Sequence, residues 1–233
     1  MLHNGLLVIK NPIIVALDVS SATEAWSLAE KLHGAVGCFK VGMELYAAEG
    51  PAFVRQLVNA GVGVFLDMKF YDIPETVKRA TAVAASMGVD LLTVHGSGPV
   101  MRGAVEGRAG ARLKLLAVTV LTSFDSEDMA DLGYTASIPD LVDLRVRKAR
   151  QAGIDGIVCS PLEVARVREI AGPDAILVTP GVRSAGARQG DQKRVATPRE
   201  ALRAGASMLV IGRQITRAAD PRGEALRILD EIA

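Results

Sequence analysis

Aromatic side chains are scarce in this chain of 233 residues. Phe, Tyr and Trp make up 4% of it, whereas hydrophobic residues reach 49%. Ala, Val, Leu and Ile must therefore fill the core, which suits helices packed closely on a sheet. There are only two cysteines, Cys38 and Cys159, and neither lies in a CxxC or other metal-ligand spacing. Both fall in apolar runs, so we expect buried free thiols, a reducing compartment and hence a cytoplasmic protein.

An excess of charge of one sign is also absent, since 27 Lys and Arg stand against 26 Asp and Glu. No broad basic field is expected, and nucleic acid is therefore not a predicted partner. The short basic group within residues 145–150 is typical of the solvated side of a helix. The apolar stretch Leu6–Val19 is interrupted by Lys10, Pro12 and Asp18. It predicts neither a signal peptide nor a transmembrane span, so no membrane partner is expected.

Eight short apolar runs are each followed by a segment with helical spacing. The strand-like runs are Ile13–Val19, Val36–Val41, Val62–Lys69, Leu91–His95, Leu115–Leu121, Ile157–Ser160, Ile176–Thr179 and Met208–Gly212. The helical segments are Thr23–His33, Ala52–Ala60, Glu75–Met87, Val100–Glu106, Ile138–Ala152, Leu162–Ile170, Arg199–Ala204 and Gly223–Ile232. Eight such pairs with no linker between them predict an α/β fold, a (β/α)8 TIM barrel forming a single domain over residues 1–233.

Three helix starts support this assignment. Ser21–Glu24, Ser160–Glu163 and Thr197–Glu200 each read as a capping box, the last two with proline at the first helical position. The main alternative is a doubly wound open sheet. It is disfavoured because Asp18–Ser21 stands where a GxGxxG turn would follow the first strand.

The densest group of charged residues lies at the end of the third predicted strand, within Phe65–Val77. Strand alternation places Asp67 and Lys69 on one face, and Asp72 follows just before the next helix. In a parallel barrel this strand end lies at the active-site face. An acid and a base there are costly to bury unless they serve a site or neutralise each other. A structural ion-pair network that closes the barrel mouth is the alternative interpretation.

Asp18 and Lys40 come at the ends of two other predicted strands. Together with Asp67 and Lys69 they predict an alternating array of carboxylates and ammonium groups. Such an array suits a polyanionic substrate, because each lysine is held charged by neighbouring carboxylates.

Two turns at the last predicted strands, Thr179–Arg183 and Ile211–Arg213, each combine a glycine with an arginine. Barrels commonly bind phosphate after strands seven and eight, so we expect a phosphate site here. The alternative is that the glycines only permit tight turns.

Two segments, Thr122–Thr135 and Arg183–Thr197, are long enough to be mobile and are candidate lids on the active-site face. His95 has no second ligand in metal spacing. We therefore expect a satisfied histidine at the barrel mouth rather than a metal ligand.

The block Asp67–Val77 resembles the DxKxxDIPxTV signature of the orotidine 5′-phosphate decarboxylase family. Further motifs of that family follow in the right order over the whole chain. They are the first-strand Asp18, Lys40 in FKVG, Thr122 in LTS, TPGVR ending at Arg183, the DQ pair ending at Gln192, and VIGR ending at Arg213.

The resemblance implies a homodimer with active sites at the subunit interface. Lys40, Asp67 and Lys69 would come from one subunit, and Asp72, Ile73 and Thr76 from its partner. The residues that would hold the ribose, pyrimidine and phosphate are Asp18, Thr122, Pro180, Arg183, Gln192, Gly212 and Arg213.

The activity implied by the resemblance is decarboxylation of orotidine 5′-phosphate to uridine 5′-phosphate, a step of pyrimidine biosynthesis. Loss of CO2 leaves a carbanion at C6 without an adjacent electron sink. An ammonium group there can stabilise the charge and deliver a proton, the role assigned to Lys69. No metal or organic cofactor is expected.

Three other functions are consistent with parts of this pattern. A metal-dependent phosphosugar decarboxylase or synthase would need an acidic ligand on the second strand, where this chain has Lys40. A Schiff-base aldolase would need Lys69 as a neutral amine, which the flanking Asp67 and Asp72 disfavour. A non-catalytic binder of phosphate ligands would have little reason to retain opposed buried charges.

Overall fold

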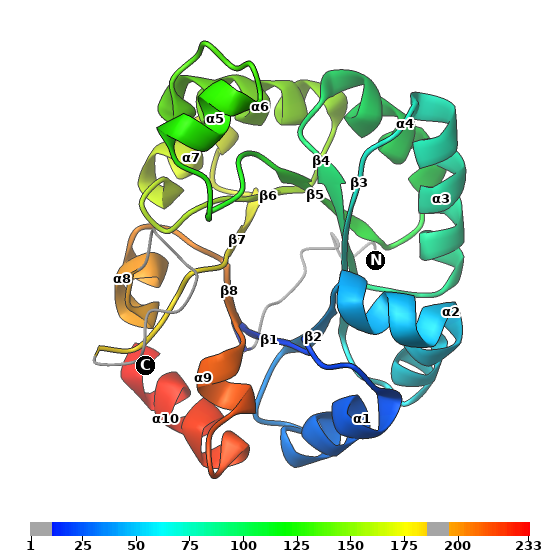
Figure 1. Cartoon of the computed structure of the whole chain (residues 1–233), viewed down its shortest axis with the longest axis vertical. Coiled ribbons are helices and arrows are strands. Elements are labelled where there is room, and N and C mark those ends of the chain that lie inside the picture. The colour runs from blue at the N-terminus through cyan, green and yellow to red at the C-terminus, as the bar shows by residue number, and fades with distance from the viewer. Residues whose placement is uncertain (1–10, 186–195) are drawn as a thin grey trace, which may run out of the picture.

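The computed structural model describes residues 11–185 and 196–233. Its eight strands pair in parallel and in chain order, and β1 also pairs with β8, which closes the barrel (Figure 1). The (β/α)8 barrel predicted from the sequence is therefore confirmed. The strands are β1 (Ile13–Ala16), β2 (Cys38–Val41), β3 (Val64–Phe70), β4 (Leu91–His95), β5 (Lys114–Val118), β6 (Gly156–Val158), β7 (Ile176–Thr179) and β8 (Met208–Ile211).

Helices surround the strands as an outer ring (Figure 1). They are α1 (Ala22–Lys31), α2 (Met43–Asn59), α3 (Pro74–Ser86), α4 (Gly98–Arg108), α5 (Ser126–Asp131), α6 (Ile138–Ala152), α7 (Val164–Ala171), α8 (Pro198–Arg203), α9 (Arg213–Thr216) and α10 (Pro221–Ile232). Within the two described ranges, no helix has the length and apolarity to cross a bilayer.

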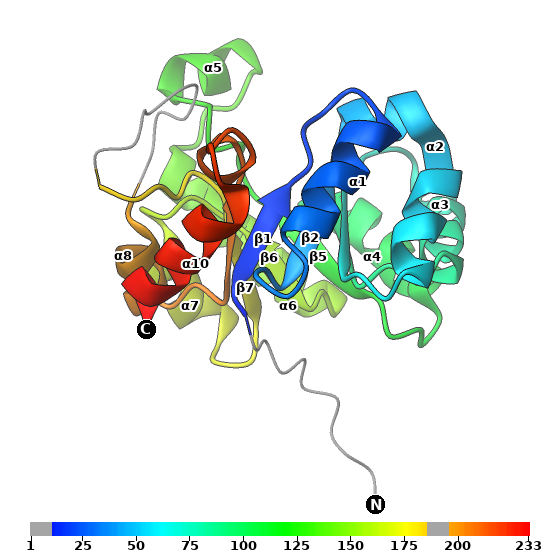
Figure 2. The same ribbon diagram turned by 90° about the horizontal axis from the view of Figure 1, so that it is seen from below.

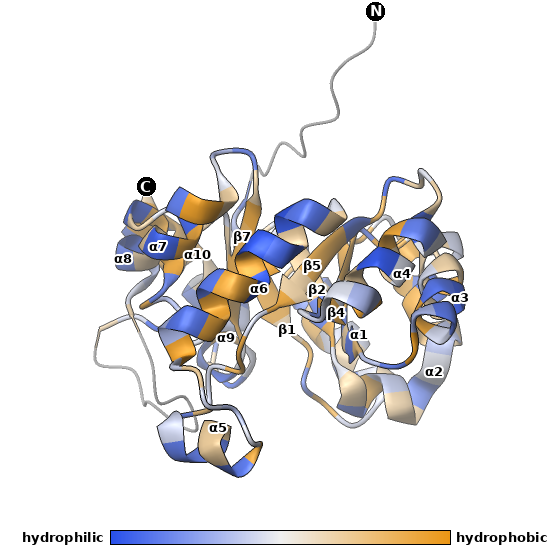
Figure 3. Ribbon diagram, turned by 90° about the horizontal axis from the view of Figure 1, so that it is seen from above, coloured by the Kyte–Doolittle hydropathy of each residue, from blue (hydrophilic) through white to orange (hydrophobic). Residues whose placement is uncertain are grey.

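Alternation along the strands divides the buried side chains into two groups. One fills the space between the strands and the helices, where apolar helix faces turn inward and polar ones outward (Figure 3). The other fills the barrel interior with Ile14, Cys38, Phe65, Leu91, Leu116, Val178 and Met208. Several of these residues precede a polar residue of the same strand by two positions. Apolar side chains thus fill the barrel interior, and polar side chains lie nearer the carboxyl ends of the strands.

The predicted strands overrun the observed ones at several carboxyl ends. The first was expected to reach Val19 but ends at Ala16, and the fifth was expected to reach Leu121 but ends at Val118. Val19 is nevertheless buried. The loops that follow the strands still bury their first apolar residues against the helices. The apolar run in the sequence is therefore longer than the hydrogen-bonded strand.

The helical segments also differ from the sequence prediction. The second helix was expected to begin at Ala52, but α2 begins at Met43 and continues past a break at Gly50, whose φ is 66°. The Gly50–Pro51 pair predicts a helix boundary, yet the chain continues as a helix after it. The candidate lid Thr122–Thr135 contains α5, which projects at one end of the barrel (Figure 2).

The helix caps agree with the prediction to different degrees. Thr197 and Glu200 form the full capping box at α8. At α1, Ser21 Oγ accepts from Glu24 N at 3.3 Å, which is half of a box. At Ser160 the helix start was placed too early, because α7 begins at Val164. There Glu163 Oε2 accepts from Ser160 N at 3.2 Å within a preceding turn.

Candidate active site

A cavity of about 330 Å³ opens at the carboxyl ends of the strands. Nine of the thirteen residues predicted to form the site line this cavity. They are Asp18, Lys40, Asp67, Lys69, Thr122, Pro180, Arg183, Gly212 and Arg213. Segments from most of the strands, far apart in the sequence, thus meet in one place, as the barrel prediction requires.

The expected array of alternating charges is present in the cavity. Lys40 Nζ lies 2.9 Å from Asp18 Oδ1 and 3.7 Å from Asp67 Oδ2, and Lys69 Nζ lies 2.9 Å from Asp67 Oδ1. The side chain of Asp67 is only 14% exposed and touches both lysines. The two ammonium groups offset the cost of burying this carboxylate. The Lys69 side chain is 33% exposed, so its ammonium group can meet a ligand in the cavity.

An irregularity in β3 positions Lys69. Leu66 pairs with Leu92 of β4, but the next pair is Phe70 with Val94, so the register shifts between them. Lys69 within this shift has a φ of 48°, in the left-handed region. The bulge therefore aims the lysine from the strand end into the cavity.

Thr93 of β4 holds this bulge in place, although the sequence pattern predicted no role for it. Its fully buried hydroxyl accepts from Lys69 N at 2.9 Å and donates to Asp67 Oδ1 at 2.9 Å. Thr93 thus fixes the backbone of the lysine and one oxygen of the carboxylate. A threonine two positions after the interior-facing Leu91, within an apolar strand, was the signal that could have revealed it.

The two Gly–Arg turns approach the cavity from β7 and β8. Gly181 has a φ of 76°, which favours glycine, and Gly212 is the residue before α9. Arg183 is held by a hydrogen bond from its N to Ala196 O at 3.0 Å. In the ring of eight strands, β3 and β7 lie opposite each other (Figure 1). Lys69 belongs to β3 and Arg183 to the turn after β7, so the two residues line the cavity from different sides.

Three predicted site residues among those described do not line the cavity. Asp72 and Ile73 are exposed beside the mouth and Thr76 is half-buried at the start of α3. Asp72 Oδ1 accepts from Ile73 N at 2.6 Å. Their position outside their own cavity is what a role in another subunit's site would require. Gln192 lies outside the described residues, as does most of the second candidate lid.

His95 lies at the barrel mouth as expected, but its hydrogen bonding differs from the prediction. Its ring stacks on Tyr71, with centroids 4.1 Å apart. Its Nδ1 is buried without a hydrogen-bond partner among the residues described, so it is not the satisfied histidine that was expected. Burial, assisted by the nearby charge of Arg145, lowers the pKa of His95 to about 4. The ring is therefore neutral at neutral pH.

Arg145 itself departs from the expected solvated group. It is half-buried and donates to Thr119 O and, at 2.8 Å, to the Tyr134 hydroxyl. The guanidinium thus fastens α6 to the end of β5. Arg147, Lys148 and Arg150 are exposed, as predicted for the solvated side of a helix.

The donor groups at the mouth suit an organic anion better than a metal ion. Asp18 and Asp67, the acidic pair of the cavity, both lie against the ammonium group of Lys40. A divalent cation between these carboxylates would meet that positive charge. Over the described part of the chain, no three His, Cys, Asp or Glu residues come together as a metal site. Both cysteines are buried free thiols, as expected.

Comparison with known proteins places this geometry in a family. Residues 11–228 match the model of the orotidine 5′-phosphate decarboxylase / HUMPS family. The chain is 52% identical over 221 residues to an orotidine 5′-phosphate decarboxylase of a Caulobacter species, covering 95% of this chain and 96% of the relative. It is 50% identical over 224 residues to the enzyme of that name from Rhodopseudomonas palustris, with 96% and 95% covered.

Solved structures agree with these relatives. The crystal structure of orotidine 5′-phosphate decarboxylase from Lactobacillus acidophilus superimposes with a TM-score of 0.85 at 34% identity, covering 95% of this chain and 99% of that one. A conserved protein of Geobacillus kaustophilus, described as uncharacterized, gives a TM-score of 0.83 at 37% identity, covering 95% and 100%.

Proposed function

This chain belongs to the orotidine 5′-phosphate decarboxylase / HUMPS family, and we propose that it converts orotidine 5′-phosphate to uridine 5′-phosphate and CO2 in pyrimidine biosynthesis. The observation that carries the proposal is the Asp18–Lys40–Asp67–Lys69 array, which lies in the same cavity as Arg183 and Arg213. The cavity thus offers charged groups for a reacting centre and cationic groups for a phosphate.

Lys69 is the proposed proton donor. Loss of CO2 breaks the bond between C6 and the carboxyl carbon and leaves the electron pair on C6. The ammonium group stabilises this charge and transfers a proton to C6, forming the C6–H bond of the product. Asp67, 2.9 Å from Lys69 Nζ, pairs with the lysine and orients it before the reaction.

Lys40 positions the two carboxylates of the array. Its ammonium group bridges Asp18, which follows β1, and Asp67, which lies within β3. We infer that Asp18 contacts the ribose, since its side chain is 59% exposed and has an oxygen to spare for a hydroxyl. Thr122 and Pro180 line the remaining wall, where a pyrimidine would lie.

Arg183, Gly212 and Arg213 are the proposed phosphate site, with Gln192 as a further ligand. Guanidinium groups bind phosphate oxygens through paired charge-assisted hydrogen bonds. The phosphate is remote from the reacting carbon, so its binding energy can be used to close the site and to improve the reacting geometry.

The reaction is proposed to need no metal or organic cofactor. Lys40 supports this, because it supplies fixed positive charge between the acidic residues of the cavity. The same residue argues against the metal-dependent phosphosugar decarboxylase considered above, which would place an acidic ligand on β2.

The active enzyme is proposed to be a homodimer with shared sites, in which Asp72, Ile73 and Thr76 complete the partner's cavity. Large apolar side chains near the mouth are exposed in the single chain, with Tyr71 at 67%, Ile73 at 66% and Met43 at 61%. Exposed apolar side chains of this size are costly unless a partner covers them. A cytoplasmic location stays a prediction, consistent with the free thiols.

A direct assay tests the proposal. Purified protein is incubated with orotidine 5′-phosphate, and the formation of uridine 5′-phosphate and CO2 is followed together. We expect stoichiometric conversion of substrate into both products. Protein that bound the nucleotide without releasing CO2 would contradict the proposal and favour the non-catalytic binder.

A further inference from the structure

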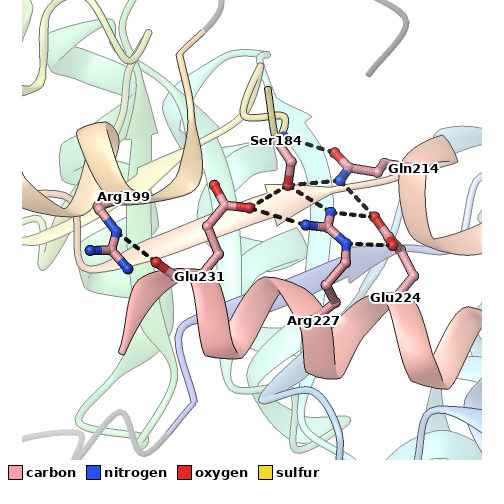
Figure 4. A network of polar contacts seen from close by, with 6 residues as sticks. All are labelled: Ser184, Arg199, Gln214, Glu224, Arg227 and Glu231. Carbon is pink, nitrogen blue, oxygen red and sulfur yellow. Dashed lines mark hydrogen bonds and ion pairs between the residues drawn. The ribbon is translucent and has the colours of Figure 1, made fainter. Parts of the chain in front are cut away.

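The residues that follow the two cavity arginines in the chain are bonded to each other. Ser184 follows Arg183, and Gln214 follows Arg213. Ser184 N donates to Gln214 Oε1 at 3.1 Å, and Gln214 Nε2 donates back to Ser184 Oγ at 3.0 Å. This reciprocal pair, which we call the Ser184–Gln214 clamp, joins the turn after β7 to α9 after β8 (Figure 4).

The polar atoms of the clamp are fully used. A hydroxyl has one donor and two acceptor positions. Besides accepting from Gln214, Ser184 Oγ accepts from Arg227 Nη2 at 2.9 Å and donates to Glu231 Oε2 at 2.6 Å. The second hydrogen of Gln214 Nε2 is directed to Glu224 Oε1 at 2.8 Å. With Ser184 buried at 7% exposure, the geometry of the clamp leaves little freedom.

α10 backs the clamp with three charged side chains. Arg227 binds both oxygens of Glu224, at 2.9 Å and 2.7 Å, and lies 3.5 Å from Glu231 (Figure 4). The hydrogen bond from Arg227 lowers the pKa of Glu224, and Glu224 in turn raises the pKa of Arg227. Glu224 and Arg227 are therefore ionised at neutral pH, and all three side chains lie on a regular helix of twelve residues.

We propose that the Ser184–Gln214 clamp is a positioning unit that sets the relative placement of Arg183 and Arg213 for recognition of the substrate phosphate. The inference rests on the proposed function, in which those two arginines bind phosphate. Bidentate contacts from a guanidinium depend on angle as well as distance, and a small displacement of a binding group is costly. Each clamp residue adjoins its arginine through one peptide bond, so it fixes the backbone from which that side chain extends.

The test compares two ligands that differ only by the phosphate. Inhibition constants of uridine 5′-phosphate and uridine are measured against turnover for the wild type, Ser184→Ala and Gln214→Met. Methionine has nearly the volume of glutamine but makes none of its hydrogen bonds. We expect the ratio of the uridine constant to the uridine 5′-phosphate constant to fall about tenfold in each variant, while uridine itself binds unchanged. The double variant should resemble either single one, because both break the same unit.

Two controls make the result interpretable. Arg199→Ala removes a contact from Arg199 Nε to Glu231 O at 2.7 Å, which touches the same helix but not the clamp, so the ratio should stay at the wild-type value (Figure 4). Arg213→Ala should abolish most of the phosphate preference. If it does not, the phosphate site of the proposed function is wrong.

A loss of phosphate preference in Arg213→Ala with an unchanged ratio in both clamp variants would overturn this inference and leave the proposed function standing. A fall in uridine affinity equal to that for uridine 5′-phosphate would also overturn it, since the defect would then be general. Circular dichroism verifies folding, and either clamp variant alone decides the outcome if the other fails to fold.

Discussion

Gly42 leaves room for Lys40: a Cβ placed on Gly42 would lie 2.9 Å from Lys40 Nζ and 3.3 Å from Asp18 Oδ1. The backbone at Gly42 has a φ of −94° and a ψ of −175°, which alanine can adopt. The backbone thus permits a side chain at position 42, but a Cβ there would force the Lys40 ammonium group to shift.

Gly42→Ala should thus impair catalysis without unfolding the barrel. The added methyl group displaces the end of the Lys40 side chain from Asp18 and disturbs the array that holds Lys69. We expect kcat/KM to fall about ten- to a hundredfold, with a melting temperature near the wild-type value. Steady-state kinetics and thermal denaturation check this. Wild-type kinetics in the variant would show that Lys40 can move without consequence.

Lys69→Ala should lose turnover far more than stability. Removing a positioned general acid costs about 10²–10⁴-fold in rate. Asp67 would keep Lys40 as a charge partner, so the fold would not be left with an isolated buried carboxylate. Single-turnover assays and chemical denaturation measure the two effects. Lys78→Ala is the matched control, since Lys78 lies on α3 and pairs with Glu106 away from the cavity.

Shared active sites predict recovery of activity when two inactive variants are mixed. In a heterodimer of Lys69→Ala and Asp72→Ala, one site carries both defects and the other is intact. Random reassembly gives about half heterodimers, so roughly one quarter of wild-type activity should return. Mixing Lys69→Ala with Asp67→Ala is the control, because both side chains come from one subunit and no intact site forms. If activity did not return in the mixture of Lys69→Ala with Asp72→Ala, or returned equally in both mixtures, the proposed sharing would be contradicted.

Chelation separates the proposed enzyme from a metal-dependent relative. The Lys40 ammonium group lies between the acidic side chains of the cavity, so turnover should be unchanged after exhaustive treatment with EDTA. Loss of activity with EDTA and its restoration by Mg²⁺ would refute the cofactor-independent reaction.

The half-buried ring of His95 predicts a loss of stability at mildly acidic pH. Because burial and Arg145 lower the pKa of His95 from 6.5 to about 4, the unfolded chain binds a proton that the folded protein excludes. Above pH 6.5 the His95 ring is neutral in both the folded and the unfolded state, so the free energy of unfolding is at its full value. It declines as the pH falls from 6.5 towards 4, because the unfolded chain then binds a proton. His95→Phe keeps the stacking on Tyr71 but cannot titrate.

The difference between wild type and His95→Phe in free energy of unfolding should therefore change across pH 6.5–4. Denaturant titrations at several pH values measure it. Replacement of the exposed His33 by Gln is the control and should leave the pH dependence of the wild type. Parallel curves for wild type and His95→Phe would count against a neutral His95 ring in the folded protein.

Much of this architecture could be predicted because each strand carries its own signal. Alternation alone placed Asp67 and Lys69 on the interior face, although the register shift in β3 was not foreseen. The shift does not exchange their faces, since both line the cavity. Charged residues at the ends of apolar strands are conspicuous in sequence, and closure of the barrel brings them together.

Contacts between separate strands and loops could not be predicted in the same way. Thr93 contacts Asp67 across 26 positions of the chain, and Ser184 contacts Gln214 across 30. Periodicity describes one segment at a time and gives no partner for a serine or threonine in the next. The start of α2 was missed for a local reason, since Pro51 reads as a boundary that the fold does not respect.

The left-handed backbone at Lys69 has a cost that the folded barrel carries permanently. A φ of 48° is unfavourable for any residue with a side chain, and it is held here by the hydrogen bond from Lys69 N to Thr93 Oγ1. Glycine adopts this conformation with less strain, so selection for thermal stability alone would favour replacing the lysine at this position. Directed evolution for stability without an activity screen would thus tend to lose the proposed proton donor early. Libraries built on this barrel should keep position 69 fixed.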